Sequence, residues 1–175
     1  MNPAPPVTRI FTSGDSNRHL ASVTATGLEV EVIKAARVPV PVSFVRDVMA
    51  RATAIPEVAA RLPEGASTIA VRLTGDRELR RLNREYAGED SVTDVLSFEG
   101  SGGHVGDLAI SWSTAVRQAE AFGREPETEL ALLCVHGLLH LLGWDHATAG
   151  ERKEMNRITR AALKRSGITL ARGRL

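Results

Sequence analysis

PETELALLCVHGLLHLLGWDH, residues 126–146, is the stretch around which the rest of the chain is organised. Pro126 stands where the first turn of a helix tolerates proline, and Gly143 is a natural stop at a helix C-terminus. Nearly all the side chains from Leu130 to Leu142 are apolar, which indicates a helix that is buried on most sides. The stretch therefore predicts a central buried helix that carries histidines near its end.

The spacing of those histidines predicts a metal site. His136 and His140 are four residues apart, so a helix places them on one face, about 6 Å apart along its axis. Gly143 then ends the helix and lets the chain turn back, which brings His146 towards the same point. Three neutral imidazoles suit zinc, and three protein ligands leave a fourth position for water or substrate. We expect one zinc ion per chain, held by His136, His140 and His146.

Two neighbours of His136 refine this expectation. The alternative to a metal site is a set of satisfied core histidines, but buried imidazoles without partners would carry a desolvation cost that a metal removes. Zinc peptidases share the ligand spacing and have a glutamate general base directly after the first histidine. That position is Gly137 here, which counts against proteolysis. Cys134 lies about 200° round the helix from His136 and is expected to belong to the core.

The rest of the chain predicts one α+β domain with about four strands in a mixed sheet and about five helices. The zinc site lies at the end of the central helix. Apolar alternation or β-branched runs predict strands at 28–33, 68–73, 92–98 and 105–111. Helical spacing predicts further helices at 43–61, 76–86, 112–123 and 148–165. Pro56 is expected to kink or split the first of them.

Domain organisation follows from length and composition. The chain has 175 residues, of which 43% are hydrophobic and 25% charged, as expected for one globular domain. Residues 1–27 contain Pro3, Pro5 and Pro6 and have no sustained apolar period, so we expect a disordered N-terminal extension. Residues 28–175 are expected to form a single metal-dependent hydrolase domain with a basic C-terminal helix and tail.

Composition also excludes several classes. Aromatic residues make up 4% of the chain, too few for a base-stacking platform of the kind that binds single strands. The single cysteine, Cys134, excludes an intramolecular disulfide and indicates a reducing compartment without a disulfide-linked partner. No secretion signal or membrane span is evident. We therefore expect a cytoplasmic protein with no membrane partner.

Positive charge is concentrated at the C-terminus. Residues 151–175 contain eight Lys or Arg and two Glu, a net charge of +6, whereas the whole chain carries +1. On the last predicted helix, one face carries Lys153, Arg157, Arg160 and Lys164, opposite an apolar face. We take Lys153, Arg157 and Arg160 as candidates that contact RNA phosphates, with a merely solvated face as the alternative.

The histidine motif and three other stretches of the chain resemble a known family. His136–His146 is similar to the zinc motif of the YbeY family of bacterial rRNA-maturation endoribonucleases. The stretches LNREY at 82–86, TDVLSF at 93–98 and GDLAIS at 106–111 support the match in the same order. The likeness covers about residues 28–166. It implies a zinc-dependent endoribonuclease acting in 16S rRNA 3′-end maturation and ribosome quality control, with rRNA and the small ribosomal subunit as partners.

One residue departs from the family pattern. Ala87 stands where the family usually has an arginine that lines the cleft, so a guanidinium that could bind a phosphate is missing. Arg84, or Arg80 and Arg81, could supply this charge from one turn earlier, and Arg84 is our candidate catalytic residue besides the ligands.

Three residues of the TDVLSF stretch are candidates for substrate binding. Thr93, Asp94 and Ser97 carry hydroxyl or carboxylate groups that could hydrogen-bond substrate or a ligand histidine, and a turn-and-strand cap is the alternative.

The expected reaction is hydrolysis of RNA phosphodiester bonds by zinc-activated water, with polarisation of a phosphoryl oxygen by the zinc as the alternative. Two other functions remain open. One is a ribosome-binding assembly factor with a structural zinc and little catalysis, and the other is a zinc peptidase-like hydrolase.

Overall fold

The computed structural model describes residues 22–23 and 27–170. Most of the predicted extension at 1–27, and the basic tail from 171 onwards, lie outside these ranges. Each predicted helix and strand of the domain is present, within a few residues at either end. The single α+β domain predicted from the sequence is therefore confirmed.

The sheet is mixed and has the strand order β1-β2-β3-β5-β4. β2, β3 and β5 run parallel, whereas β1 and β4 pair antiparallel with β2 and β5 at the two edges. The four predicted strands correspond to β2 to β5. β1 is a two-residue strand that the sequence did not predict, in which Ser22 pairs with Val30. The strands are β1 (Ser22–Val23), β2 (Glu29–Lys34), β3 (Thr68–Thr74), β4 (Val95–Glu99) and β5 (His104–Ser111).

The helices are α1 (Val42–Thr53), α2 (Pro56–Ala59), α3 (Asp76–Leu82), α4 (Trp112–Phe122), α5 (Pro126–Leu141) and α6 (Ala149–Arg165), with a π-helical turn, η1 (Asn83–Ala87), after α3. Pro56 splits the first predicted helix in two, because its ring fixes the start of α2 and removes a backbone donor. The helix predicted at 76–86 widens into η1 and ends at Gly88, whose φ of 73° is left-handed.

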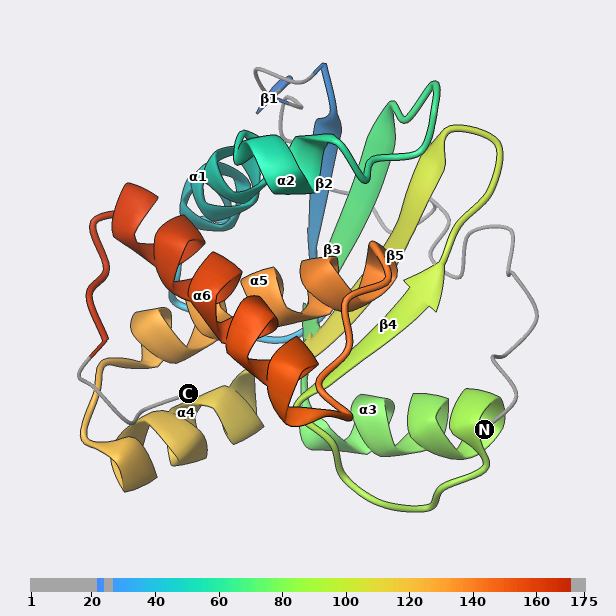
Figure 1. The fold of residues 1–175 in the computed structure, drawn as a ribbon. Helices are drawn as coiled ribbons and strands as arrows, with labels where there is room; N and C mark the ends of the chain where they lie inside the picture. The colour runs from blue at the N-terminus through green and yellow to red at the C-terminus, as the bar shows by residue number, and fades with distance from the viewer. Residues whose placement is uncertain (1–21, 24–26, 171–175) are drawn as a thin grey trace.

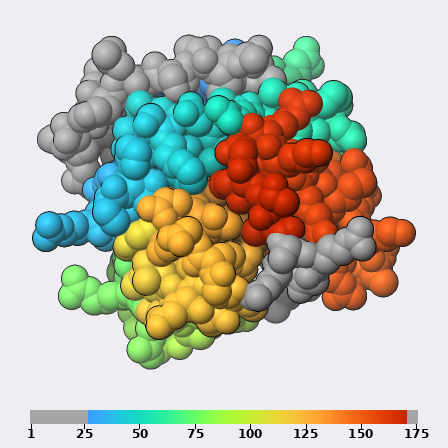
Figure 2. All heavy atoms as spheres, turned by 90° about the vertical axis from the view of Figure 1, so that its left-hand side faces the viewer, coloured from blue at the N-terminus to red at the C-terminus, as the bar shows by residue number. Residues whose placement is uncertain are grey.

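α5 is the central helix of the fold. It packs against α1, α4, α6, β4 and β5, and Figure 1 shows it between the sheet and α6. Its leucines belong to the large core cluster, and burying each such side chain contributes about 1.5–3 kcal/mol. In Figure 2 the helical layer, with α1, α4 and α6 adjoining one another, forms one side of the molecule. A second, smaller core on the α3 side contains Leu79, Leu82, Phe98 and Ala109.

Cys134 lies in the core of α5 and is fully buried. Burial in an apolar environment disfavours the thiolate and raises the pKa of Cys134 to about 12. The thiol is therefore a packing group rather than a nucleophile, as its place on the helix predicted.

Asp76 joins the start of α3 to the start of α4. Its carboxylate accepts hydrogen bonds from the side chains of Ser111, Ser113, Thr114 and Arg117. Burial raises the pKa of this carboxyl, but the hydrogen bonds outweigh burial and hold it well below its ordinary value. The carboxylate is therefore charged in the folded protein down to acidic pH.

We expect Asp76→Asn to destabilise the protein at pH 7 by about 1.5–3 kcal/mol, the range for hydrogen bonds to a charged group. Since the folded pKa is depressed, this contribution is complete above the unfolded pKa of about 3.9 and is lost as the pH falls towards the folded pKa. Urea unfolding at pH 7 and pH 3 measures the difference. Asp47→Asn, at an exposed position of α1, is the control, and an equal loss for Asp76→Asn at both pH values would contradict the prediction.

Candidate metal centre

The structure brings the three predicted ligands together at the C-terminal end of α5. His136 and His140 come from its last turns, and His146 comes from the loop that follows. One nitrogen of each ring lies within 4.8 Å of the others, and the Nε2 atoms of His136 and His140 are 3.1 Å apart. These three residues, the histidine triad, can therefore contact one ion.

Local backbone structure accounts for the position of His146. Gly143 has a left-handed φ of 79°, and the N–H of Trp144 returns to the carbonyl of Leu139 at 2.9 Å, so the chain reverses directly after α5. The N–H of His146 donates to the Asp145 carboxylate at 2.7 Å. Two residues later Thr148 caps α6, so the third ligand lies between two closely spaced helix ends.

Electrostatics keep the triad able to bind a cation. Burial, with smaller contributions from His140 and His146, lowers the pKa of His136 to about 4. Burial and His146 also lower the pKa of His140. These two imidazoles are therefore uncharged at neutral pH and have ligand lone pairs available. His136 and His140 are half-buried whereas His146 is exposed, so the triad has a solvent side. Three imidazole ligands with solvent access fit zinc with an open position.

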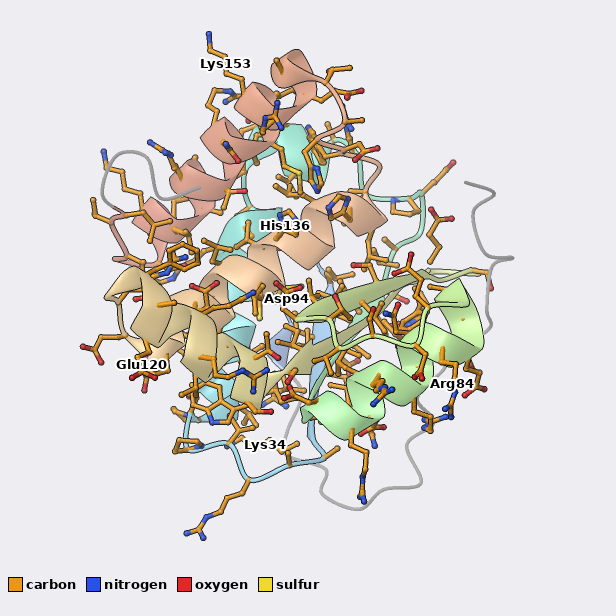
Figure 3. The ribbon with its side chains drawn as sticks, turned by 90° about the horizontal axis from the view of Figure 1, so that it is seen from below. Lys34, Arg84, Asp94, Glu120, His136 and Lys153 are labelled. Atoms are coloured by element: carbon orange, nitrogen blue, oxygen red, sulfur yellow. The ribbon has the colours of Figure 1, made fainter. Side chains whose placement is uncertain are left out.

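Asp94 lies beside the triad, directly before β4. Figure 3 shows it close to His136, and its negative charge acts to raise the pKa of that histidine. Its Oδ1 accepts from the N–H of Val95 and its Oδ2 from Nε2 of Gln118, both at 2.8 Å. The carboxylate is thus held in a fixed orientation. The sequence offered no signal for Gln118, which comes from the middle of α4.

Thr93 and Ser97 are engaged with backbone. The Ser97 hydroxyl donates to the carbonyl of Gly137 at 3.3 Å, which links β4 to α5. The Thr93 hydroxyl makes a long contact of 3.5 Å with the carbonyl of Val95. Asp94 is therefore the member of this predicted group whose charge acts on the triad.

Gly137 shows why the peptidase glutamate has no counterpart. A Cβ at this position would lie 2.9 Å from Cδ2 of Leu108 and 3.2 Å from Cγ2 of Val95. The position therefore faces the sheet, where α5 packs closely on β4 and β5. A carboxylate here would lie in the packed core.

The structure does not bring Arg84 to the triad. Figure 3 shows Arg84 on the outer side of the α3–η1 segment, apart from His136. Its guanidinium lies 4.0 Å from the Asp90 carboxylate, which Arg80 binds through two hydrogen bonds of 2.8 and 2.9 Å. The depression that these arginines border has a volume of about 610 Å³ and is lined by Arg77, Glu78, Arg80, Arg81 and Arg84.

The amphipathic character predicted for α6 is confirmed. Met155, Ile158 and Ala162 are buried. A second depression, of about 580 Å³, is lined by Ala149, Arg152, Lys153, Asn156, Arg157 and Arg160. Figure 3 shows Lys153 pointing away from the body of the protein. Arg157 forms an exposed ion pair with Glu57 at 3.1 Å, which is easily exchanged for another anion.

The family of the chain follows from a match that spans most of the domain. The family model described as Endoribonuclease YbeY matches residues 34–167, which include the whole triad. The chain belongs to the YbeY family. The resemblance found in the sequence motifs is therefore confirmed, and the triad is the candidate metal centre of a YbeY-family protein.

Curated relatives agree with this assignment. The chain is 50% identical over 93 residues to the protein named Endoribonuclease YbeY from Gloeobacter violaceus, and this match covers 47% of the chain and 48% of that protein. It is 43% identical over 112 residues to the protein of the same name from Chloroflexus aurantiacus, covering 57% of the chain and 72% of the relative. The chain thus spans about half the length of the first YbeY relative and more of the second.

A solved structure has the same fold. The solution structure of TM1509 from Thermotoga maritima aligns with a TM-score of 0.51 at 19% identity, covering 77% of this chain and 89% of that one.

Within residues 22–23 and 27–170, no helix is both long and apolar enough to cross a bilayer.

Proposed function

We propose that this YbeY-family chain is a zinc-dependent endoribonuclease that hydrolyses RNA phosphodiester bonds. The observation that carries the proposal is the convergence of three imidazoles with a solvent side, in a family whose curated relatives are named endoribonucleases. In the cell, the proposed role of this endoribonuclease is 16S rRNA 3′-end maturation and ribosome quality control in the cytoplasm. Its partners are rRNA and the small ribosomal subunit.

His136, His140 and His146 hold the metal. Zinc bound there would supply Lewis-acid chemistry, lowering the pKa of a water molecule or polarising a phosphoryl oxygen. Asp94, oriented by Val95 and Gln118, retains free lone pairs on its carboxylate oxygens and accepts a hydrogen bond from water or from a ribose hydroxyl beside the triad.

Basic side chains away from the triad bind the RNA backbone. Lys153, Arg157 and Arg160 line one depression on α6, and Arg84 lines another beside η1. Arginine suits this task because its planar guanidinium binds two phosphate oxygens at once. Arg84 in this proposal is a binding residue rather than a catalytic one, because Figure 3 places it apart from His136.

A second candidate function is a ribosome assembly factor with a structural zinc and little catalysis. The observation that favours it concerns the arginines that could bind a phosphate near the triad. The arginine usual in the family is replaced by Ala87 here, and Arg84 lies beside Asp90. A peptidase role is opposed by Gly137, which faces the sheet.

Cleavage of a precursor 16S rRNA fragment by the purified zinc-loaded chain tests the proposal. We expect cutting that a chelator abolishes and added zinc restores, and no cutting by His140→Ala prepared identically. Binding of small subunits by a zinc-loaded chain that cuts no RNA would overturn the nuclease and establish the assembly factor.

We expect the combined replacement of Lys153, Arg157 and Arg160 by alanine to weaken RNA binding uniformly across sequences. Removing three phosphate contacts should flatten the slope of log affinity against log salt by about 2 for single-stranded RNA. Fluorescence anisotropy in the non-cutting His140→Ala background measures this without degradation of the probe. Arg37→Ala, an exposed charge on the loop after β2, is the control, and an unchanged slope in the triple variant would contradict the assignment.

A further inference from the structure

Trp144 is buried although it belongs to the loop that carries the third ligand. Trp144 is 5% exposed, whereas Gly143, Asp145 and His146 on either side are exposed. Of the loop residues from 143 to 147, it is the one that reaches the core. The indole therefore anchors this loop to the domain.

Two side chains from distant segments hold the indole. The Arg61 guanidinium, from the segment after α2, lies over the ring at 3.7 Å from its centroid. The indole N–H donates to Oε1 of Glu154, in the second turn of α6, at 3.4 Å. One contact fixes a face of the ring and the other fixes its edge, so together they set the ring orientation.

His146 depends on this anchor because it lacks a helix of its own. His136 and His140 are oriented by α5, whereas His146 follows Trp144 by two residues and its N–H bonds the neighbouring Asp145. A loop that is ordered before the metal arrives loses less conformational entropy on binding than one that orders with it. The anchored indole therefore helps to order His146 before the metal binds.

We propose that Arg61, Trp144 and Glu154 form a clamp that positions His146 and thereby sets the affinity and geometry of the metal centre. The three are positioning residues and touch neither the metal nor the substrate. This inference rests on the metal-binding part of the proposed function and is independent of RNA cleavage.

Metal binding by the full chain tests the clamp directly. We expect Arg61→Ala to weaken zinc binding about 10-fold and Trp144→Leu about 100-fold, the range for groups that support a metal ligand. Chelator competition measures the zinc Kd, and the visible absorption of the cobalt-substituted protein reports ligand geometry. Arg61→Lys keeps a cation over the ring and should restore most of the affinity.

Two comparisons separate positioning from general packing. Arg61 is exposed, so Arg61→Ala leaves no buried cavity and should fold even if Trp144→Leu does not. Glu57→Gln removes the ion pair between α2 and α6 without touching Trp144 and should leave the zinc Kd and the cobalt spectrum unchanged.

An unchanged zinc Kd and cobalt spectrum in Arg61→Ala would overturn the clamp, and so would an equal loss of affinity in Glu57→Gln. Either result in a chain that binds zinc and cuts RNA would leave the proposed function intact. Conversely, weaker metal binding in Arg61→Ala with rescue by Arg61→Lys establishes the clamp even if no RNA is cut.

Discussion

His136→Ala is expected to abolish tight zinc binding, with a loss of affinity beyond the roughly 100-fold that removal of a supporting group can cause. The reason is that two nitrogens remain where three converge within 4.8 Å, and His136 is one of the two half-buried members whose pKa burial lowers. Zinc content after dialysis and the Kd from chelator competition measure the loss. Cleavage of RNA should disappear with the metal.

His104→Ala is the matched control for this variant. His104 is also half-buried, but its ring bonds Thr68 and Asp107 on the sheet, and it is not part of the triad. The control should keep its zinc. Full zinc content in His136→Ala, or an equal loss in His104→Ala, would mean that the metal is held elsewhere.

Gly137→Glu is expected to destabilise the protein by at least about 3 kcal/mol and to create no peptidase activity. A side chain here would meet Leu108 and Val95 at distances that require the helix or sheet to move, and its carboxylate would be desolvated. The variant restores the sequence pattern of a zinc peptidase without placing the base at the metal. Urea unfolding measures the stability, and a fluorescent peptide assay measures activity.

Gly150→Glu is the control for Gly137→Glu. Gly150 lies in the first turn of α6, where a Cβ would come no closer than 4.0 Å to Thr148, and an acidic residue near a helix N-terminus is favourable. This variant should retain its stability. A stable Gly137→Glu protein that cleaves peptides would refute the packing argument.

The local parts of the fold were predictable because they depend on neighbours in sequence. Proline at 56 and 126, and glycine at 123 and 143, mark helix boundaries through backbone geometry alone. β1 was not predictable, since two residues have no period and pair only through a partner strand. The strand predicted at 92–98 begins later, at Val95, because the chain bends at Asp94, whose carboxylate accepts a hydrogen bond from the N–H of Val95.

The residues of the candidate site also fall into those that were predictable from the sequence and those that were not. The triad was predictable because a helix and one turn bring its members together within eleven residues. Arg61 and Gln118 were not, because their contacts depend on how α2 and α4 pack against segments distant in sequence. Arg84 illustrates the limit of helix projection. The left-handed Gly88 turns the chain back and places Asp90 beside Arg80 and Arg84. The role of Arg84 in RNA binding stays a prediction.

Because α5 is central to the fold, a metal bound at the triad, as proposed, would stabilise the whole domain. This helix packs against five other elements, so the triad cannot assemble in a chain whose core has opened. An ion that binds the folded chain alone stabilises it by mass action, by about 4 kcal/mol when its free concentration is 1,000 times Kd. Under the proposed function, zinc starvation would therefore lower the amount of folded protein as well as its activity, and the melting temperature would report metal occupancy.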